Sequence, residues 1–155
     1  RFVIGISAVT TNAAEMEAGP AGRIPALWQR FVAEDVLTQI PNRLSAANQP
    51  RMVALYTDLA SDEHGEYRIV LGALVADLSE IPDGMVGRSV PAGKFERVTS
   101  ERGPIAEVTI GVWQRVWRDA ALKARRSYTG DLELYDDRSA NPEDAQIDLL
   151  IGVGG

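Results

Sequence analysis

The sequence DLELYDD, at residues 131–137, decides the fold of this chain. Its apolar side chains Leu132 and Leu134 alternate with Glu133 and Tyr135, which is the period of a β-strand, and two aspartates end the run. Glu133 and Tyr135 therefore share one face of that strand. If this face points inward, an unpaired carboxylate costs on the order of several kcal/mol, so Glu133 needs a proton or a cationic partner.

Length and composition indicate one globular domain. The chain has 155 residues, of which 45% are hydrophobic, and no apolar run is long enough to cross a bilayer. No segment resembles a signal peptide, so we expect a cytoplasmic, soluble protein. Cysteine is absent, which excludes disulfides, thiolate metal ligands and cysteine nucleophiles. The net charge of -6 argues against direct nucleic-acid binding and favours attraction of small cations.

Apolar periodicity predicts six strands and two main helices along the chain. The expected strands are Phe2–Ser7, Met52–Thr57, Tyr67–Val75, Lys94–Thr99, the stretch around Glu133, and Gln146–Val153. The expected helices are 24–32, after a glycine- and proline-rich loop at 19–25, and 105–124. Lys123, Arg125 and Arg126 are interpreted as positive charges that favour the C-terminus of the second helix.

The two halves of the chain have the same order of elements, and short sequences recur in them. LWQRF at 27–31 returns as VWQRV at 112–116, ALYTD at 54–58 returns as ELYDD at 133–137, and IVLG at 69–72 returns as LLIG at 149–152. We interpret this as an internal duplication, with repeats at about 1–80 and 87–155. Glu133 then has Ala54 as its counterpart, so one side of a near-symmetric surface carries a carboxylate. A cleft between two similar halves is a common ligand site.

These motifs, in this order, resemble the GyrI-like small-molecule-binding domain. That domain is the effector-binding part of AraC-type and MerR-type multidrug regulators and also occurs in stand-alone, integron-associated effector-binding proteins. The resemblance rests on the duplication and on Ile24-Pro25 with Leu27-Trp28 and Phe31, Leu55–Asp58 before Ser61-Asp62, Gly65 with Tyr67, Pro91–Phe95, and Leu132–Asp136. It implies a single α+β domain over residues 1–155, in which duplicated β-α-β-β units of the SHS2 type form an antiparallel sheet with two main helices and a central ligand pocket.

The resemblance also implies a function and a set of site residues. The pocket is expected to bind small lipophilic or aromatic cations, such as drug-like effectors, with Glu133 as the acidic residue at its floor. Trp28, Met52, Tyr56 and Trp113 are the expected wall residues, and no cofactor or metal is implied. We expect a bacterial sensor or sequestration module linked to transcription regulation or drug resistance. No helix-turn-helix pattern precedes the domain, so an effect on DNA would need a separate DNA-binding partner protein.

Pattern alone also supports simpler interpretations of the same residues. Trp28 and Trp113 lie on apolar helix stripes, where a tryptophan is more often part of the core, and Tyr56 is typical of cross-strand packing. The long stretches 13–22 and 43–50 fit lids over a pocket as well as ordinary loops.

An enzyme is the main alternative class of function. The single histidine, His64, lies in a polar hairpin turn, which excludes the usual nucleophilic triads. Asp58, Asp62 and Glu63 crowd the same turn without imidazole partners, so we interpret them as solvated residues rather than metal ligands.

Two other activities of GyrI-like proteins remain open. Some members are hydrolases that open strained electrophilic rings of cytotoxins, and here Glu133 would be the general base, with Tyr56 or Tyr135 assisting. Others are interaction modules that inhibit DNA gyrase, although no concentrated acidic run supports that role here.

Overall fold

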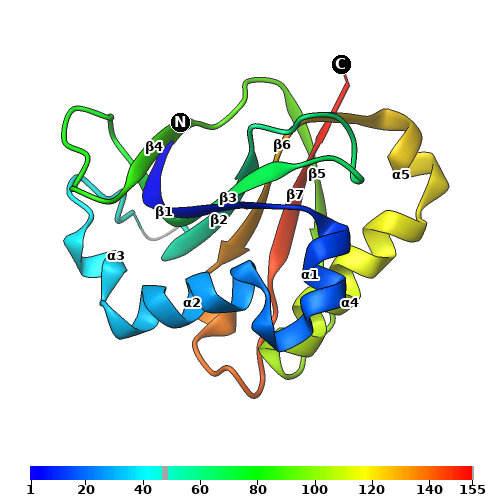
Figure 1. Ribbon diagram of the computed structural model, residues 1–155, viewed down its shortest axis with the longest axis horizontal. Helices are drawn as coiled ribbons and strands as arrows, with labels where there is room; N and C mark the ends of the chain where they lie inside the picture. The colour runs from blue at the N-terminus through cyan, green and yellow to red at the C-terminus, as the bar shows by residue number, and fades with distance from the viewer. Residues whose placement is uncertain (47–48, 155) are drawn as a thin grey trace.

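The computed structural model describes residues 1–46 and 49–154, which form one seven-stranded antiparallel sheet with helices packed against it (Figure 1). The strands are β1 (Phe2–Thr10), β2 (Met52–Thr57), β3 (Tyr67–Val75), β4 (Val86–Ser89), β5 (Lys94–Thr99), β6 (Arg126–Tyr135) and β7 (Asp148–Val153). The helices are α1 (Asn12–Ala18), α2 (Arg23–Ala33), α3 (Val36–Gln39), α4 (Ile105–Arg118) and α5 (Ala120–Arg125), with short 3-10 turns η1 (Gly19–Ala21) and η2 (Asp137–Ser139). Within these described ranges, no helix has the length and apolar character needed to cross a membrane. The α+β class predicted from the sequence is confirmed.

The sheet is nearly symmetric about the seam between β2 and β6. Its strand order is β4-β1-β3-β2-β6-β7-β5, with every neighbouring pair antiparallel. Going outward from the seam, each half presents its second strand, then its third, then its first. This is the order that two β-α-β-β units produce when they pair through their second strands.

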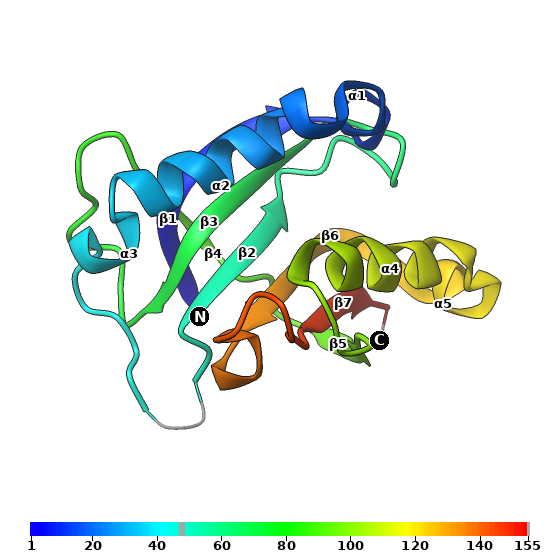
Figure 2. The ribbon, with the colours of Figure 1, turned by 90° about the horizontal axis from the view of Figure 1, so that it is seen from below.

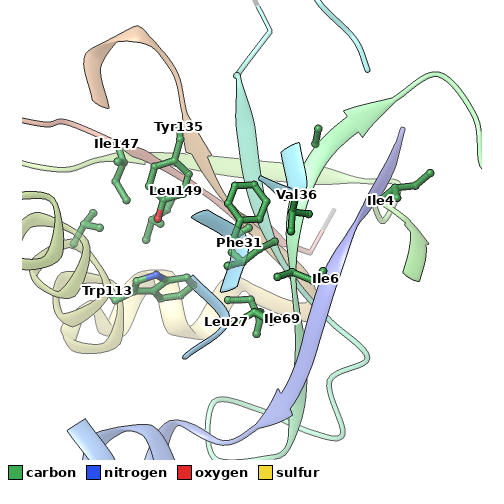
Figure 3. Close-up of a cluster of buried hydrophobic side chains, with 14 of the residues drawn as sticks. Ile4, Ile6, Leu27, Phe31, Val36, Ile69, Trp113, Tyr135, Ile147 and Leu149 are labelled. Atoms are coloured by element: carbon green, nitrogen blue, oxygen red, sulfur yellow. The ribbon is translucent and has the colours of Figure 1, made fainter. Parts of the chain in front are cut away.

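The two main helices cover the same face of the sheet. In Figure 2, α2 lies along β1 and β3, and α4 lies beside β6 and β7 in the other half. The core between helices and sheet includes Phe31 from α2, Trp113 from α4, and Ile6, Ile69 and Tyr135 from the strands (Figure 3). Burial of these apolar side chains positions the two helices on either side of the β2–β6 seam.

The opposite face of the sheet is also buried at its centre. Val53, Leu55 and Leu132 alternate with the helix-facing residues of their strands and form a second apolar cluster. Val90 and Phe95, at the two ends of the β4–β5 connection, pack against it. Because β4 and β5 lie at opposite edges of the sheet, this connection ties the two halves together.

The segments between the predicted elements differ from expectation. The loop predicted at 19–25 is wrong in part, because α2 begins at Arg23 and Pro25 lies in its first turn, where a missing N–H leaves no bond unmade. The expected lid at 13–22 is mostly helix α1, and the one at 43–50 includes residues 47–48, which lie outside the described ranges. The strand β4 had no sequence signal.

The helix predicted at 105–124 is divided in two. Asp119 interrupts it and caps α5, because its side chain accepts a hydrogen bond from the backbone N–H of Leu122 at 3.0 Å. The helix then ends at Arg125, and Arg126 begins β6. The interpretation of Arg126 as a helix-terminal charge is therefore wrong, since that side chain turns into the interior.

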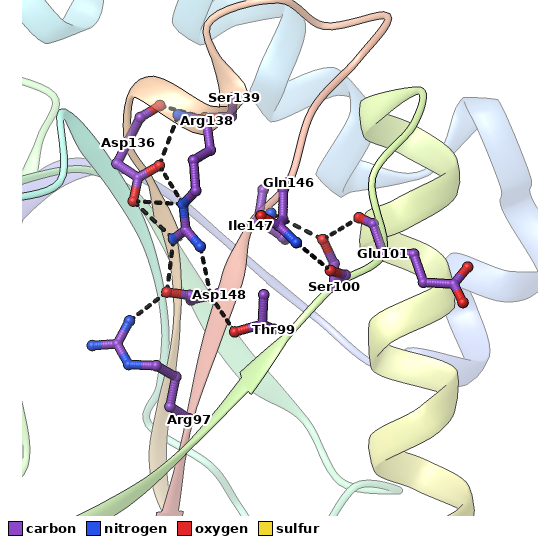
Figure 4. A network of polar contacts seen from close by, with 10 residues as sticks. All are labelled: Arg97, Thr99, Ser100, Glu101, Asp136, Arg138, Ser139, Gln146, Ile147 and Asp148. Atoms are coloured by element: carbon purple, nitrogen blue, oxygen red, sulfur yellow. Dashed lines mark hydrogen bonds and ion pairs between the residues drawn. The ribbon is translucent and has the colours of Figure 1, made fainter.

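A polar network fixes the end of β6 and the connection to β7 (Figure 4). Arg138 donates to Asp136 at 2.8 Å and to Asp148 at 2.8 Å, and Arg97 also pairs with Asp148. The Arg138 guanidinium holds the pKa of Asp136 below its usual value. These contacts anchor the strand whose other face carries Glu133.

Candidate functional site

Glu133 faces inward, beneath the helices, and only 2% of its surface is exposed. Its Oε2 atom accepts hydrogen bonds from the Tyr56 hydroxyl at 2.6 Å and from the Trp113 indole N–H at 2.7 Å. Its Oε1 atom accepts from the Tyr135 hydroxyl at 2.5 Å. The three donors come from β2, α4 and β6, so the carboxylate joins both halves of the molecule.

The charge of this carboxylate has no cationic partner among the residues that the structure describes. All three donors are uncharged, and within residues 1–46 and 49–154 no ion pair of 4.0 Å or less involves Glu133. Hydrogen bonds to a charged group are worth roughly 1.5 to 3 kcal/mol each, so they can hold a carboxylate in the interior without neutralising it. The site is therefore a buried carboxylate without a counter-ion among the described residues, surrounded by aromatic rings.

The two tyrosines act as permanent donors. Burial raises the pKa of the Tyr56 hydroxyl well above its usual value, and the nearby charge of Glu133 raises it further. Burial and Glu133 raise the pKa of Tyr135 in the same way. Both phenols therefore stay protonated throughout the physiological pH range.

Aromatic contacts around Glu133 cross from one half of the molecule to the other. Trp28 on α2 packs edge-on against Tyr135 on β6, with ring centres 5.2 Å apart. Trp113 on α4 packs edge-on against Tyr56 on β2 at 5.1 Å. These are the geometries that aromatic quadrupoles favour. The cluster extends from Tyr56 to Tyr67 at 5.5 Å.

The strand register brings one pair of counterpart residues of the two repeats face to face. Ala54 lies directly opposite Glu133 across the seam, and Met52 lies opposite Tyr135. Met52 is half-buried against the helix-facing core, and the small side chain of Ala54 leaves room for the carboxylate beside it. The carboxylate of Glu133 therefore lies at the boundary between the two repeats, beside residues of both.

The structure places all five predicted site residues on the helix-facing side of the sheet. Glu133, Tyr56 and Trp113 are joined by hydrogen bonds, Trp28 reaches them through Tyr135, and Met52 lies at the edge of the group. Their part in ligand binding stays a prediction. The position of Tyr135 beside Glu133 follows from strand alternation, whereas its hydrogen bond does not.

Sequence reasoning missed a second buried carboxylate. Asp131 lies two residues before Glu133, is 2% exposed, and pairs with Arg126 at 2.8 Å. It also accepts a hydrogen bond from the backbone N–H of Gly152 at 3.0 Å. Burial raises the pKa of Asp131, and Arg126 opposes that rise. Strand alternation could have identified Asp131, because residues two apart in a strand face the same side of the sheet and Glu133 faces the interior.

One acidic residue of the 58–66 turn is not solvated as predicted. Asp58 and Asp62 are exposed, and His64 is an exposed turn residue as expected, with 79% of its side chain accessible. The Glu63 side chain is only 10% exposed and lies 2.7 Å from the ammonium of Lys123. In the described part of the chain, no group of three or more His, Cys, Asp or Glu side chains is placed to hold a metal ion.

Two surface hollows lie away from Glu133. One, of about 800 Å³, is lined mainly by residues 37–46 and 49–51, and the other, of about 340 Å³, lies between the start of α1 and the start of α2. Glu133, Tyr56 and Trp113 line neither of them. Because aromatic side chains pack directly on the carboxylate, a ligand that contacts Glu133 has to displace some of them.

Several known proteins are similar to this chain over most of its length. YobU of Bacillus subtilis (strain 168), whose name places it among transcriptional regulators, is 29% identical over 149 residues, which cover 96% of this chain and 89% of YobU. The transcriptional regulator BrlR of Pseudomonas aeruginosa (strain PAO1) is 28% identical over 141 residues, 88% of this chain. The match spans 48% of BrlR, so this chain corresponds to about half of that protein.

Solved structures with the same fold support this relationship. An integron cassette protein from the mobile metagenome of Vibrio cholerae has a TM-score of 0.72 at 24% identity, over 99% of this chain and 90% of its own. SAV2435, solved bound to tetraphenylphosphonium, has a TM-score of 0.68 at 17% identity, over 99% of this chain and 88% of its own. The family model described as integron-associated effector binding protein (Cass2) matches residues 1–153. The chain therefore belongs to the family of integron-associated effector binding proteins.

Proposed function

We propose that this protein binds lipophilic aromatic cations at Glu133, as a sensor or sequestration module for such compounds. The observation that carries the proposal is a buried carboxylate held by uncharged donors alone among the described residues. A cation that enters this site would supply the missing opposite charge. SAV2435, which shares the fold, was solved with an organic cation of this kind.

The physical balance favours a delocalised cation over a compact one. Each Å² of apolar ligand surface removed from water contributes about 25 cal/mol. Contacts between the positive charge and aromatic faces such as Trp28 and Trp113 add roughly 0.5 to 2 kcal/mol each. A lipophilic cation is weakly hydrated and loses little on leaving water, whereas an ammonium ion loses more.

Binding requires that the aromatic side chains separate. Trp28 is half-buried and donates no hydrogen bond to Glu133, so it is the wall residue that moves at the smallest cost. Met52, at the edge of the group, has an unbranched thioether that adapts to ligands of different shape. A transcriptional output, as the names of YobU and BrlR suggest, would need a DNA-binding unit in addition to the domain described here.

Calorimetric titration with tetraphenylphosphonium tests the proposal. We expect saturable binding to the wild-type protein, a loss of about a hundredfold in affinity for Glu133→Gln, and weak binding of the neutral analogue triphenylphosphine oxide to both. Glu66→Gln is the matched control, because it removes an exposed carboxylate and should bind like wild type. Equal affinity of wild type and Glu133→Gln for the cation would refute the proposal.

Hydrolysis at the same site has less support. The three hydrogen bonds already use three of the roughly four acceptor positions of the Glu133 carboxylate, which leaves little room for a water molecule on it. The raised pKa values of Tyr56 and Tyr135 make both phenols weaker acids. Mass spectrometry of a strained epoxide after incubation with the protein separates the two functions, since turnover abolished in Glu133→Gln would favour hydrolysis.

A further inference from the structure

We propose that Glu63 is the latch of a gate over the Glu133 site. The gate consists of the β2–β3 turn, residues 58–66, together with helix α1. Ion pairs from Glu63 to α5 and β6 hold the gate against the second half of the molecule. The part of this inference that concerns ligand entry rests on the proposed function, whereas the mechanical coupling does not.

A continuous series of contacts links the buried site to this turn. Tyr56, which donates to Glu133, packs against Tyr67 with ring centres 5.5 Å apart. The Tyr67 hydroxyl donates to Asn12 Oδ1 at 3.0 Å, and Asn12 Nδ2 donates to the backbone carbonyl of Glu63 at 2.9 Å. Movement of the turn therefore acts on the aromatic wall through Asn12, at the start of α1, and Tyr67.

The gate buries little surface, and within the described ranges its other polar attachments come from two residues. Glu15 of α1 accepts hydrogen bonds from Thr10 and from the backbone N–H groups of Arg23 and Ile24, and Asp58 pairs with Arg68 and Arg88. Helix α1 has no buried residue, and most of the turn at 61–66 is exposed. In Figure 2 the turn extends from the ends of β2 and β3 toward the second half. Elements with little buried apolar surface open at low free energy, so a small number of polar contacts can decide whether they stay closed.

Glu63 supplies those contacts from inside the turn. Its Oε1 atom lies 2.7 Å from Lys123 Nζ on α5 and 3.7 Å from the exposed His64 ring, and its Oε2 atom lies 3.8 Å from Arg126 Nη1 on β6. Lys123 and Arg126 belong to the second half and Glu63 to the first. The ion pairs of Glu63 therefore join the two halves of the molecule.

Several polar atoms of the latch lack hydrogen bonds. This favours a contact that has to open. Glu63 Oε2 and the Nε and Nη1 atoms of Arg126 are buried and make no hydrogen bond in the described structure. Arg126 also serves Asp131 at 2.8 Å, so one guanidinium is shared by two carboxylates. Opening the turn would let water reach these groups, which offsets part of the loss of the ion pairs.

Hydrogen exchange without ligand tests the mechanical coupling. In Glu63→Gln we expect amide exchange to rise about fivefold in residues 12–18 and 58–66 together, as loss of a modest ion pair predicts. Lys123→Gln breaks the same contact from the other side and should have the same effect. Glu66→Gln, which removes an exposed charge from the same turn, should leave both segments unchanged. Exchange that rises in one segment alone, or in neither, would overturn the latch.

Binding kinetics of tetraphenylphosphonium, followed by surface plasmon resonance, test the gate. Glu63→Gln should raise the association and dissociation rates by a similar factor of about five, so that Kd changes by less than about twofold. If tetraphenylphosphonium binds the wild type and Glu63→Gln leaves its association and dissociation rates unchanged, the gate is refuted and the proposed function stands. If wild type does not bind tetraphenylphosphonium, the proposed function and the gate both fail, and hydrogen exchange still decides whether the latch exists.

A covalent latch gives an independent result. The chain has no cysteine, so Glu63→Cys and Lys123→Cys introduce the only thiols and can be joined by a short bismaleimide. The cross-linked protein should lose association with tetraphenylphosphonium, while the same double variant before cross-linking should bind faster than wild type. Unimpaired association after cross-linking would contradict the gate.

Discussion

The two halves of this protein present the same aromatic frame and different charges. In each half, a tryptophan on the main helix packs edge-on against a tyrosine on the second strand of the other half, Trp28 on Tyr135 and Trp113 on Tyr56, at 5.2 and 5.1 Å. The interplanar angles, 74° and 68°, are also similar. The frame is therefore symmetric, and any asymmetry of function has to come from what it encloses.

Two carboxylates make that difference. Where β2 carries Met52 and Ala54, β6 carries Asp131 and Glu133 at the corresponding positions. Asp131 is neutralised by Arg126, whereas no cationic side chain of residues 1–46 or 49–154 forms an ion pair with Glu133. The duplicated scaffold thus supplies the aromatic walls twice and, within the described residues, a carboxylate without an ion-pair partner once, at the centre of the molecule.

A second carboxylate in the first half should break this arrangement most strongly. In Ala54→Glu, two buried carboxylates face each other, and we expect a loss of about 4 kcal/mol in the free energy of unfolding at pH 7. Ala54→Gln controls for the added volume and should lose less. Urea denaturation followed by circular dichroism measures both.

The double variant Ala54→Glu/Glu133→Ala then moves the charge to the other half. Because the frame is symmetric, it should recover about half of the loss of the single variant. No recovery would show that the frame accepts a carboxylate from β6 alone.

Removal of Arg126 should expose the second difference between the halves. Arg126→Met leaves Asp131 buried without its counter-charge, and we expect a loss of about 3 kcal/mol at neutral pH. Burial already raises the pKa of Asp131 above its unfolded value, and loss of Arg126 raises it further. The penalty is therefore full above the folded pKa, declines as the pH falls from the folded to the unfolded pKa, and is absent below the unfolded pKa.

Melting temperatures of wild type and Arg126→Met between pH 4 and pH 8 measure this effect. The difference in melting temperature between the two proteins should become smaller as the pH is lowered. Protonation of Asp136, whose pKa is lowered by Arg138, also reduces stability in acid. This reduction is the same in both proteins and cancels in the difference between their melting temperatures. A gap that does not depend on pH would mean that Asp131 is not the group left unpaired.

The two tryptophans should differ in spite of their matching positions. Trp113→Phe removes an indole donor to Glu133, which should lower the free energy of unfolding by about 2 kcal/mol. Trp28→Phe keeps a ring against Tyr135 and removes no hydrogen bond to the carboxylate, so its loss should stay below about 1 kcal/mol. Equal losses in guanidinium denaturation would contradict the asymmetry.

The smallest difference concerns the aspartates that interrupt the main helices. Asp35, after α2, has a left-handed backbone with φ of 49°, whereas Asp119, after α4, has φ of -83° and caps α5. Asp35→Gly should raise the free energy of unfolding by about 0.5 kcal/mol, because glycine accepts that backbone without strain. Asp119→Gly should lower it by a few tenths, about 0.3 kcal/mol. Shifts of the same sign in urea midpoints would refute this distinction.

The sequence was sufficient for the parts of the fold that depend on local pattern. Short apolar runs bounded by turn residues located β1, β2, β3, β5, β6 and β7, and alternation within β6 placed Glu133 and Tyr135 on one face. Helix α1 and strand β4 were missed because α1 buries no residue and β4 is a short edge strand. Elements without an apolar stripe leave little periodic signal.

The charged contacts of the site could not be predicted in this way. Arg126 follows a helix with a basic end, which is a common surface pattern, and only the turn of the chain into β6 buries it. Glu63 lies in a polar turn, and its burial depends on α5 of the other half. Such pairings join positions far apart in sequence, and local composition carries no information about them.

The aromatic cluster also gives the protein a built-in optical probe. The chain has three tryptophans, and all three belong to the cluster, since Trp117 packs against Trp113 at 6.1 Å and Trp28 against Tyr135. Trp113 is bound to the carboxylate through its N–H, and Trp28 is half-buried. Tryptophan emission of this protein therefore originates entirely in this aromatic cluster, so that a change in its wavelength or intensity reports on the surroundings of Glu133 without a label.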